Sequence, residues 1–250
     1  MLEGFEVAAR SLMKIVPLLV CANIIIALIN TTGIGIKMSE MIMDIGKGNI
    51  FLGLILAGSV ALVLGMGIPT VAAYLLASAV VAPALISMGI MPIAAHLFIF
   101  YYAILSALTP PVCAGVYIAA GIAQSDWLKT SWIAIRLALV KYILPFMFVY
   151  EYSLLLIGNP LRILTNLVPC IVGIIMLGGG TMGFFLRPLN IFNRGLLLAG
   201  ALLLMKPGQL SNIAGLCILI IIILAQRGLP FRGKMRQIPN TKADHQEGLK

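Results

Sequence analysis

Five residues in the middle of a long apolar stretch have types and spacing that suit ion binding: Gly65, Met66, Gly67, Pro69 and Thr70. Glycine lets backbone carbonyl groups turn toward a cation, and Thr70 offers a hydroxyl oxygen where a new helix is expected to begin. The amino-terminal end of that helix carries positive partial charge, which suits a carboxylate. The segment is therefore a candidate site for a cation and an organic anion.

A second interruption of an apolar stretch contains Ser106, Thr109, Pro110 and Pro111. Two adjacent prolines remove two amide donors, and the residue before each is pushed away from helical angles. We therefore predict a discontinuous helix over residues 92–123, with freed carbonyl groups and the hydroxyls of Ser106 and Thr109 at the break. Neutral oxygens suit a monovalent cation that must be released again. An ordinary proline kink, satisfied by neighbouring helices, is the alternative.

Signatures of catalysis and of metal binding are missing from the sequence. Its 4 cysteines stand singly in apolar stretches, and the 2 histidines, His96 and His245, are far apart. This pattern predicts neither a zinc nor a redox centre. There is no Gly-x-Ser-x-Gly, His-Glu-x-x-His or Walker sequence. We therefore expect neither an enzyme nor an ATPase, and no cofactor.

The composition indicates a membrane protein, since 61% of the residues are hydrophobic, 10% are charged and the mean hydropathy is +1.09. Soluble domains carry roughly a quarter charged residues, so a soluble enzyme, a secreted domain and a disordered regulator are excluded. The 17 Lys and Arg against 8 Asp and Glu are typical of cytoplasmic loops beside anionic lipids, and no nucleic-acid-binding surface is predicted. The predicted fold class is an all-α polytopic membrane protein in the lipid bilayer.

The two interruptions and the remaining apolar stretches divide the chain into elements. Residues 1–158 are predicted to contain a span over 15–32, an interfacial helix over 36–47, a hairpin over 51–87, a broken helix over 92–123 and a span over 131–157. Residues 159–226 are predicted to form a three-span extension, with spans over 164–185, 191–205 and 210–225. Residues 227–250 are predicted to be a basic tail. Glu151, near the end of its span, is interpreted as an interfacial carboxylate, and a proton relay is the alternative.

Residues 51–87 are predicted to form a re-entrant hairpin, in which two short helices meet inside the membrane. The first arm, residues 51–64, would reach roughly 21 Å, short of a hydrocarbon core of roughly 30 Å. No charged residue occurs from Phe51 to Ile90, although a loop facing water normally carries some. A single helix kinked at Pro69 is the alternative.

Positive charges predict the orientation of the chain. With a re-entrant hairpin, one side collects Arg10, Lys14, Lys129, Arg187, Arg194 and the basic tail. The other side holds Lys37, Lys47, Arg162 and Lys206. The positive-inside rule makes the first side cytoplasmic, so the hairpin enters from outside and the carboxyl terminus is cytoplasmic. If residues 51–87 crossed the membrane fully, the later positive charges would change sides and the excess of positive charge would lie on the opposite side.

Six segments, in order, resemble the large membrane subunit of tripartite ATP-independent periplasmic (TRAP) transporters. They are residues 65–74 (GMGIPTVAAY), 81–85 (VAPAL), 94–101 (AAHLFIFY), 108–112 (LTPPV), 119–123 (AAGIA) and 144–150 (LPFMFVY). The resemblance covers roughly residues 2–158 and is greatest to fused permeases, which often work with TAXI-type binding proteins. Residues 159–226 resemble an extension that some fused permeases carry.

The resemblance implies an elevator-type transporter in a bacterial or archaeal inner membrane, where sodium entry drives uptake of a small organic anion such as a C4-dicarboxylate. A periplasmic binding protein would deliver the anion. Family members have two inverted repeats, each with a hairpin and a broken helix, whereas this sequence has one such set. It therefore resembles the C-terminal half, and the first-half repeat and the small membrane subunit are implied partners.

On this resemblance, sodium would bind at Gly65, Gly67, Thr70, Ser106 and Thr109. Because the site segments contain no Arg or Lys, selectivity is expected to depend on the binding protein and on backbone geometry. Two other functions stay open. One is an elevator-type dicarboxylate carrier that needs no binding protein, and the other is a truncated, non-transporting fragment that needs its missing first half.

Overall fold

The computed structural model describes residues 20–228 apart from residues 22, 30 and 207. Part of the expected span over 15–32 and most of the expected tail over 227–250 therefore lie outside the described residues. The described helices, in chain order, are α2 (Ile34–Gly48), α3 (Ile50–Gly65), α4 (Thr70–Ser87), α5 (Pro92–Ser106), α6 (Ala114–Ala123), α7 (Trp127–Tyr150), the 3-10 helix η1 (Tyr152–Leu155), α8 (Pro160–Met182), α9 (Ile191–Met205) and α10 (Gln209–Gly228).

The all-α class is confirmed for the described part of the chain, where β-type pairing is limited to an isolated bridge between Phe184 and Pro188. Among the described helices, α4, α7 and α8 are long and apolar enough to cross a membrane. Residues 23–29 and α2 together form a further, bent candidate span. Such a set of apolar helices confirms a polytopic membrane protein.

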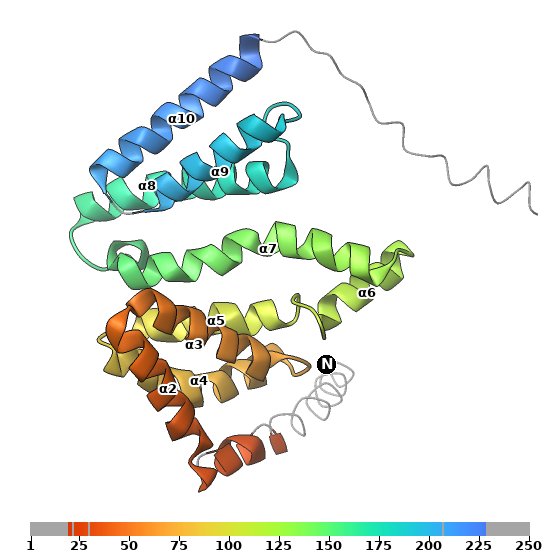
Figure 1. Ribbon diagram of the computed structural model, residues 1–250, viewed down its shortest axis with the longest axis vertical. Coiled ribbons are helices and arrows are strands. Elements are labelled where there is room, and N and C mark those ends of the chain that lie inside the picture. The colour runs from red at the N-terminus through yellow and green to blue at the C-terminus, as the bar shows by residue number, and fades with distance from the viewer. Residues whose placement is uncertain (1–19, 22, 30, 207, 229–250) are drawn as a thin grey trace, which may run out of the picture.

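Helix α7 lies between two packed units of helices and contacts both (Figure 1). On one side, Phe146 and Tyr142 of α7 pack against the buried core of α2–α5, whose largest fully buried side chain is Phe98. On the other side, Ile143 and Met147 pack against the core of α8–α10. Residues of α7 that are neighbours in sequence thus serve opposite faces, as the helical period requires.

Helices α3 and α4 run side by side in opposite directions. At one end, Met88, just after α4, packs against Gly53, near the start of α3, and Gly46 of α2. At the other end, a Cβ on Gly65 would lie 3.3 Å from Cβ of Ala73. These two close approaches, at opposite ends of the pair, show a helical hairpin whose tip lies between α3 and α4.

The amphipathic helix expected over residues 36–47 corresponds to α2, which packs on the hairpin. Ile42 is fully buried, and the hydroxyl of Ser39 donates a 2.6 Å hydrogen bond to the carbonyl oxygen of Val80 in α4. A side chain that reaches a backbone carbonyl of α4 ties the two helices together. The segment 23–29 meets α2 at an angle of 68°.

The span expected over residues 131–157 was wrong at both ends, because α7 begins at Trp127 and ends at Tyr150. The Asp126 carboxylate caps the amino-terminal end by accepting a 2.9 Å hydrogen bond from the amide of Lys129. At the other end, Glu151 adopts extended backbone angles, and the chain continues into η1. Glu151 is therefore the residue at which α7 ends, and its interfacial position stays a prediction.

Helix α8 also differs from the span expected over residues 164–185. It begins at Pro160, which suits the first helical position because proline lacks the amide donor that would be unpaired there. The side chain of Asn159 caps it by accepting a 3.0 Å hydrogen bond from the amide of Leu161. Gly183, with φ of +74°, ends it in the left-handed conformation. Helix α9 has the bounds expected for it.

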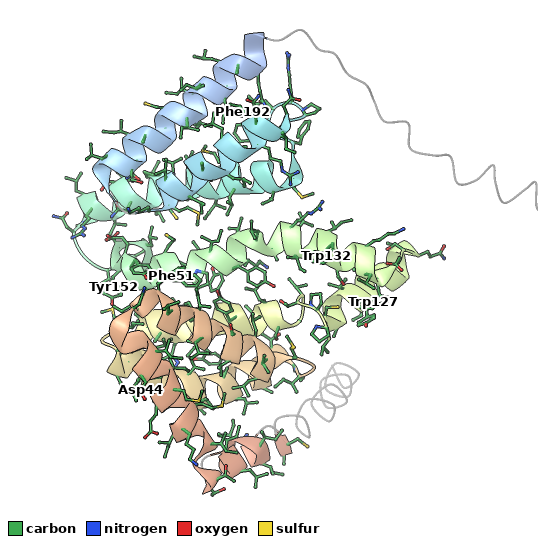
Figure 2. All side chains as sticks on the ribbon, in the orientation of Figure 1. Asp44, Phe51, Trp127, Trp132, Tyr152 and Phe192 are labelled. Carbon is green, nitrogen blue, oxygen red and sulfur yellow. The ribbon has the colours of Figure 1, made fainter. Side chains whose placement is uncertain are left out.

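Aromatic side chains mark the two ends of the molecule along α7 (Figure 2). Phe51 and Tyr152 lie at the end where α7 stops, whereas Trp127 and Trp132 lie at the opposite end. The ring of Trp127 stacks on Tyr117 of α6 with centroids 5.0 Å apart. Tryptophan is enriched at both membrane–water interfaces, so this end fits an interfacial position.

Candidate ion- and anion-binding site

The hairpin tip is a short non-helical segment between α3 and α4. Met66 ends α3 in an extended conformation, and Gly67 has φ of +80°, which favours glycine because it lacks a Cβ. Pro69 precedes α4 with φ of −59° and ψ of 145°. Because proline has no amide hydrogen and its ring clashes with the preceding turn of a helix, α4 does not extend through Pro69 toward α3. Thr70 is thus the first residue of α4.

The broken helix predicted over residues 92–123 is present as α5 and α6, separated by residues 107–113. Pro110 and Pro111 stand in this break and are joined by a cis peptide bond. Neither can donate a backbone hydrogen bond, so the helix cannot continue through them. Cys113, with φ of +23°, leads into α6.

The hairpin tip and the break of the broken helix are in contact. The hydroxyl of Ser106 donates a 2.9 Å hydrogen bond to the carbonyl oxygen of Gly65 and also lies 2.6 Å from the carbonyl oxygen of Ala103. A Cβ on Gly65 would lie 2.6 Å from the Ser106 hydroxyl, which is too close for any side chain. A Cβ on Gly67 would touch Val112 at 3.6 Å.

This contact lies alongside the interior of α7. The hydroxyls of Thr109, in the break, and Tyr142 of α7 are 2.5 Å apart. At the end of the break, the sulfur of Cys113 lies 3.5 Å from the hydroxyl of Ser131, also on α7. Both partners are internal residues of α7, a helix long enough to span the membrane. The site therefore extends along α7 from Ser131, in its second turn, to Tyr142.

Four helix ends converge here without a formal charge among them. The carbonyl ends of α3 and α5 meet the amide ends of α4 and α6, and neither amide end has a side-chain cap. Carbonyl ends attract cations and amide ends attract anions. From Ile50 to Ala123 the sequence contains no Asp, Glu, Lys or Arg. Any charge bound here is therefore met by backbone dipoles and neutral side chains.

The predicted site residues differ in burial and in whether their hydroxyl groups already make hydrogen bonds. The hydroxyl of Thr70 is half-buried and makes no hydrogen bond within the described residues. The hydroxyl of Thr109 is already used, because it also donates a 2.7 Å hydrogen bond to the carbonyl oxygen of Leu105. Ser106 is buried, Met66 and Pro110 are half-buried, and Gly67, Pro69 and Pro111 are exposed.

Tyrosines beside the break were missed by reasoning from the sequence. Tyr142 contacts Thr109, and the hydroxyl of Tyr102 donates a 3.1 Å hydrogen bond to the backbone oxygen of Tyr142. The hydroxyl of Tyr74 lies 3.0 Å from Nδ1 of His96, so this histidine links α4 to α5. No spacing rule identifies these pairs, since their members lie on different helices.

Other kinds of site are less well supported by the described residues. Within them, no group of three His, Cys, Asp or Glu side chains could hold a metal ion. The oxygens available at the tip and the break are neutral hydroxyls and carbonyls, which suit a hard monovalent cation better than a transition metal.

Comparisons with known proteins identify the family. Searches among curated proteins and among solved structures found no match to this chain. A family model described as "Tripartite ATP-independent periplasmic transporter, DctM component" matches residues 1–163, which include the hairpin and the broken helix. The match covers more than half of the chain, so this protein belongs to the DctM family of TRAP transporter permease subunits.

Proposed function

We propose that α3–α6 forms the ion- and substrate-binding part of a sodium-coupled transporter that takes up a small organic anion, in particular a carboxylate. The observation that supports this most directly is the hydrogen bond from Ser106 to the carbonyl oxygen of Gly65. It joins the two breaks in an otherwise helical structure beside the interior of α7. The family to which the chain belongs indicates a transporter that does not use ATP.

The two kinds of helix end have separate roles in this proposal. The carboxylate of the substrate binds the amide ends of α4 and α6, where amide groups lack helical acceptors. Sodium binds oxygens from Gly65, Gly67, Thr70, Ser106 and Thr109. Thr70 contributes its hydroxyl, whereas Thr109 contributes its carbonyl oxygen because its hydroxyl is engaged with Leu105 and Tyr142.

The partners follow from the family. A periplasmic binding protein would deliver the anion, and a small membrane subunit, or its fused equivalent in a TAXI-associated permease, would complete the membrane part. We place the chain in the inner membrane with its carboxyl terminus in the cytoplasm. The single hairpin and broken helix in the sequence correspond to the C-terminal half of the permease, so an equivalent first half would complete the site.

That single set also favours a second candidate function. The chain would then be a fragment that does not transport until it is combined with a first repeat. Expression alone and together with the upstream coding sequence distinguishes the two. An elevator carrier that needs no binding protein is a further outcome, and uptake in the absence of any periplasmic protein would identify it.

The sodium site is tested with Thr70→Val, which keeps the shape of the side chain and removes its oxygen. Binding of radiolabelled sodium to the purified permease should weaken by about 5- to 150-fold, because an unmade buried polar contact costs about 1–3 kcal/mol. Thr109→Val is the matched control, and sodium affinity should change less than twofold. Unchanged affinity in Thr70→Val would show that the hydroxyl is not a sodium ligand.

The re-entrant hairpin is tested by cysteine labelling in a background without native cysteines. Gly48→Cys and Ser87→Cys lie at the open end of the hairpin, and both positions are exposed. Both should react with a membrane-impermeant thiol reagent from the periplasm. Ser125→Cys, at the turn between α6 and α7, should react only from the cytoplasm. Labelling of positions 48 and 87 from opposite sides would contradict the hairpin, and α4 is long enough for that alternative.

A further inference from the structure

A polar cavity lies at the opposite end of α7 from the two tryptophans, outside the hairpin and the broken helix. It has a volume of about 700 Å³ and is lined by Glu151, Asn159, Arg162, Thr165 and Asn166, together with Leu161 and Gly208. These residues come from the end of α7, the start of α8 and the connection from α9 to α10. The cavity therefore lies at the end of the range that matches the family model, residues 1–163, and Thr165, Asn166 and Gly208 are beyond that range.

The charges in this cavity are incompletely paired. The Glu151 carboxylate has 11% of its side-chain surface exposed and makes one contact with Arg162, at 3.4 Å, through a single oxygen. The side chain of Arg162 is 70% exposed. A guanidinium and a carboxylate can form two parallel, shorter hydrogen bonds, which this pair does not. The second carboxylate oxygen has no hydrogen-bond partner among the described residues.

Two amides in the cavity also keep unused groups. Asn159 uses its oxygen to cap α8, and its amide nitrogen makes no hydrogen bond within the described part of the chain. Asn166 donates through its nitrogen to the hydroxyl of Ser153 at 3.0 Å, which leaves its oxygen available. The cavity thus offers a buried anion, an exposed cation and free amide groups within a small volume.

An apolar groove adjoins the polar cavity. It has a volume of about 470 Å³, runs between α8 and α10, and shares Thr165 with the cavity. Leu164 and Val168 of α8 and Ile213 of α10 line it, and these side chains are exposed by 60%, 50% and 60%. On the surface of a membrane-spanning helix, such side chains face lipid.

Asn212 lies in the same groove. Its side-chain oxygen is buried and has no hydrogen-bond partner among the described residues. A buried polar atom without a partner is costly, and the oxygen and nitrogen of an amide can exchange places by rotation.

We propose that the cavity and groove together bind one phospholipid with a primary-amine headgroup. The phosphate binds Arg162, the ammonium group binds the free oxygen of Glu151, and an acyl chain lies against Leu164 and Val168. The ammonium donates hydrogen bonds to the carboxylate, whereas a quaternary choline has no N–H to donate. The adjoining groove identifies a lipid as the occupant, because a soluble amino-phosphate would leave it uncovered.

The experiment is native mass spectrometry of the full chain in detergent with phosphatidylethanolamine, phosphatidylcholine or phosphatidylglycerol added. We expect phosphatidylethanolamine to bind roughly tenfold more tightly than the other two. Glu151→Gln should abolish that preference, and Arg162→Gln should weaken all three. Arg136→Gln, an exposed arginine of α7 outside the cavity, is the matched control and should bind as the wild type does.

The groove is tested separately with Val168→Trp, which fills it and leaves the charged pair in place. Lipid binding should fall roughly tenfold, while Ile175→Trp, at an exposed position of α8 outside the groove, should have no effect. Soluble glycerophosphoethanolamine should not compete with the lipid. Equal binding of the three lipids, or full competition by the soluble headgroup, would overturn the proposal.

Discussion

The hairpin and broken helix differ from α8, on the other side of α7, in how their helix ends are satisfied. In the hairpin and broken-helix unit, the amide ends of α4 and α6 have no side-chain cap, and the carbonyl oxygen of Gly65 is bonded by Ser106 from another helix. In the C-terminal unit, both ends of α8 are capped by nearby side chains. The side chain of Asn159 accepts a hydrogen bond from the amide of Leu161, and Arg194 donates hydrogen bonds to the carbonyl oxygens of Gly180, at 2.6 Å, and Thr181.

This difference bears on which helix ends can bind a ligand. Helix ends that are capped by their own neighbourhood have little left to offer a ligand. Ends that are left open inside a span carry partial charges which a bound ion can neutralise. The open amide ends of α4 and α6 therefore support the binding role that we propose for α3–α6.

Gly65→Ala should give the largest effect on transport, because the added Cβ would lie 2.6 Å from the Ser106 hydroxyl and push the tip away from the break. Uptake by the assembled transporter should fall by roughly tenfold or more, since overpacking of this kind costs about 1–3 kcal/mol. Gly178→Ala is the control, since nothing lies within 4 Å of its added Cβ. Equal uptake by the two variants would contradict the proposed contact.

Arg194→Gln should affect stability and leave transport intact. It removes charged donors from the last carbonyls of α8, which should lower the free energy of unfolding by about 1–3 kcal/mol. Thermal unfolding in detergent measures this, with Arg136→Gln as the control. Sodium affinity of the folded fraction should not change. A loss of sodium affinity would mean that the two units are coupled through α7.

Thr109→Val should give the smallest effect. Hydrogen bonds between membrane helices are worth about 0.6 kcal/mol on average, so stability should fall by about that amount. Tyr142→Phe should cost a similar amount, and the double variant should cost less than the sum because both remove the same contact. A strictly additive result would show that the two hydroxyls do not interact.

The sequence was sufficient to predict the breaks but not what they touch. Gly67 and Pro69, and the pair Pro110 and Pro111, interrupt helices for local steric reasons, so their positions could be read from residue types. The bond between Ser106 and Gly65 joins residues 41 positions apart, and no local rule predicts it. The re-entrant depth of the hairpin remains a prediction.

The ends of α7 and α8 could also not be placed from hydropathy alone. Apolar residues continue from Leu154 to Ile157, so the hydropathy of the sequence did not show that the helix stops at Tyr150. The helix stops where Glu151 adopts extended backbone angles, and Glu151 contacts Arg162 in the next helix. The hydrogen bonds of Arg194 to the end of α8 were also missed, because these partners belong to a different helix.

The absence of charged residues from Ile50 to Ala123 has an electrical consequence. Moving one elementary charge through the full membrane potential changes the energy by about 2.3 kcal/mol per 100 mV. Two amide ends and two carbonyl ends carry partial charges that sum to about zero. If α3–α6 crosses the membrane as one body, its empty return is independent of voltage, and the measured current counts only the sodium ions and the anion that it carries.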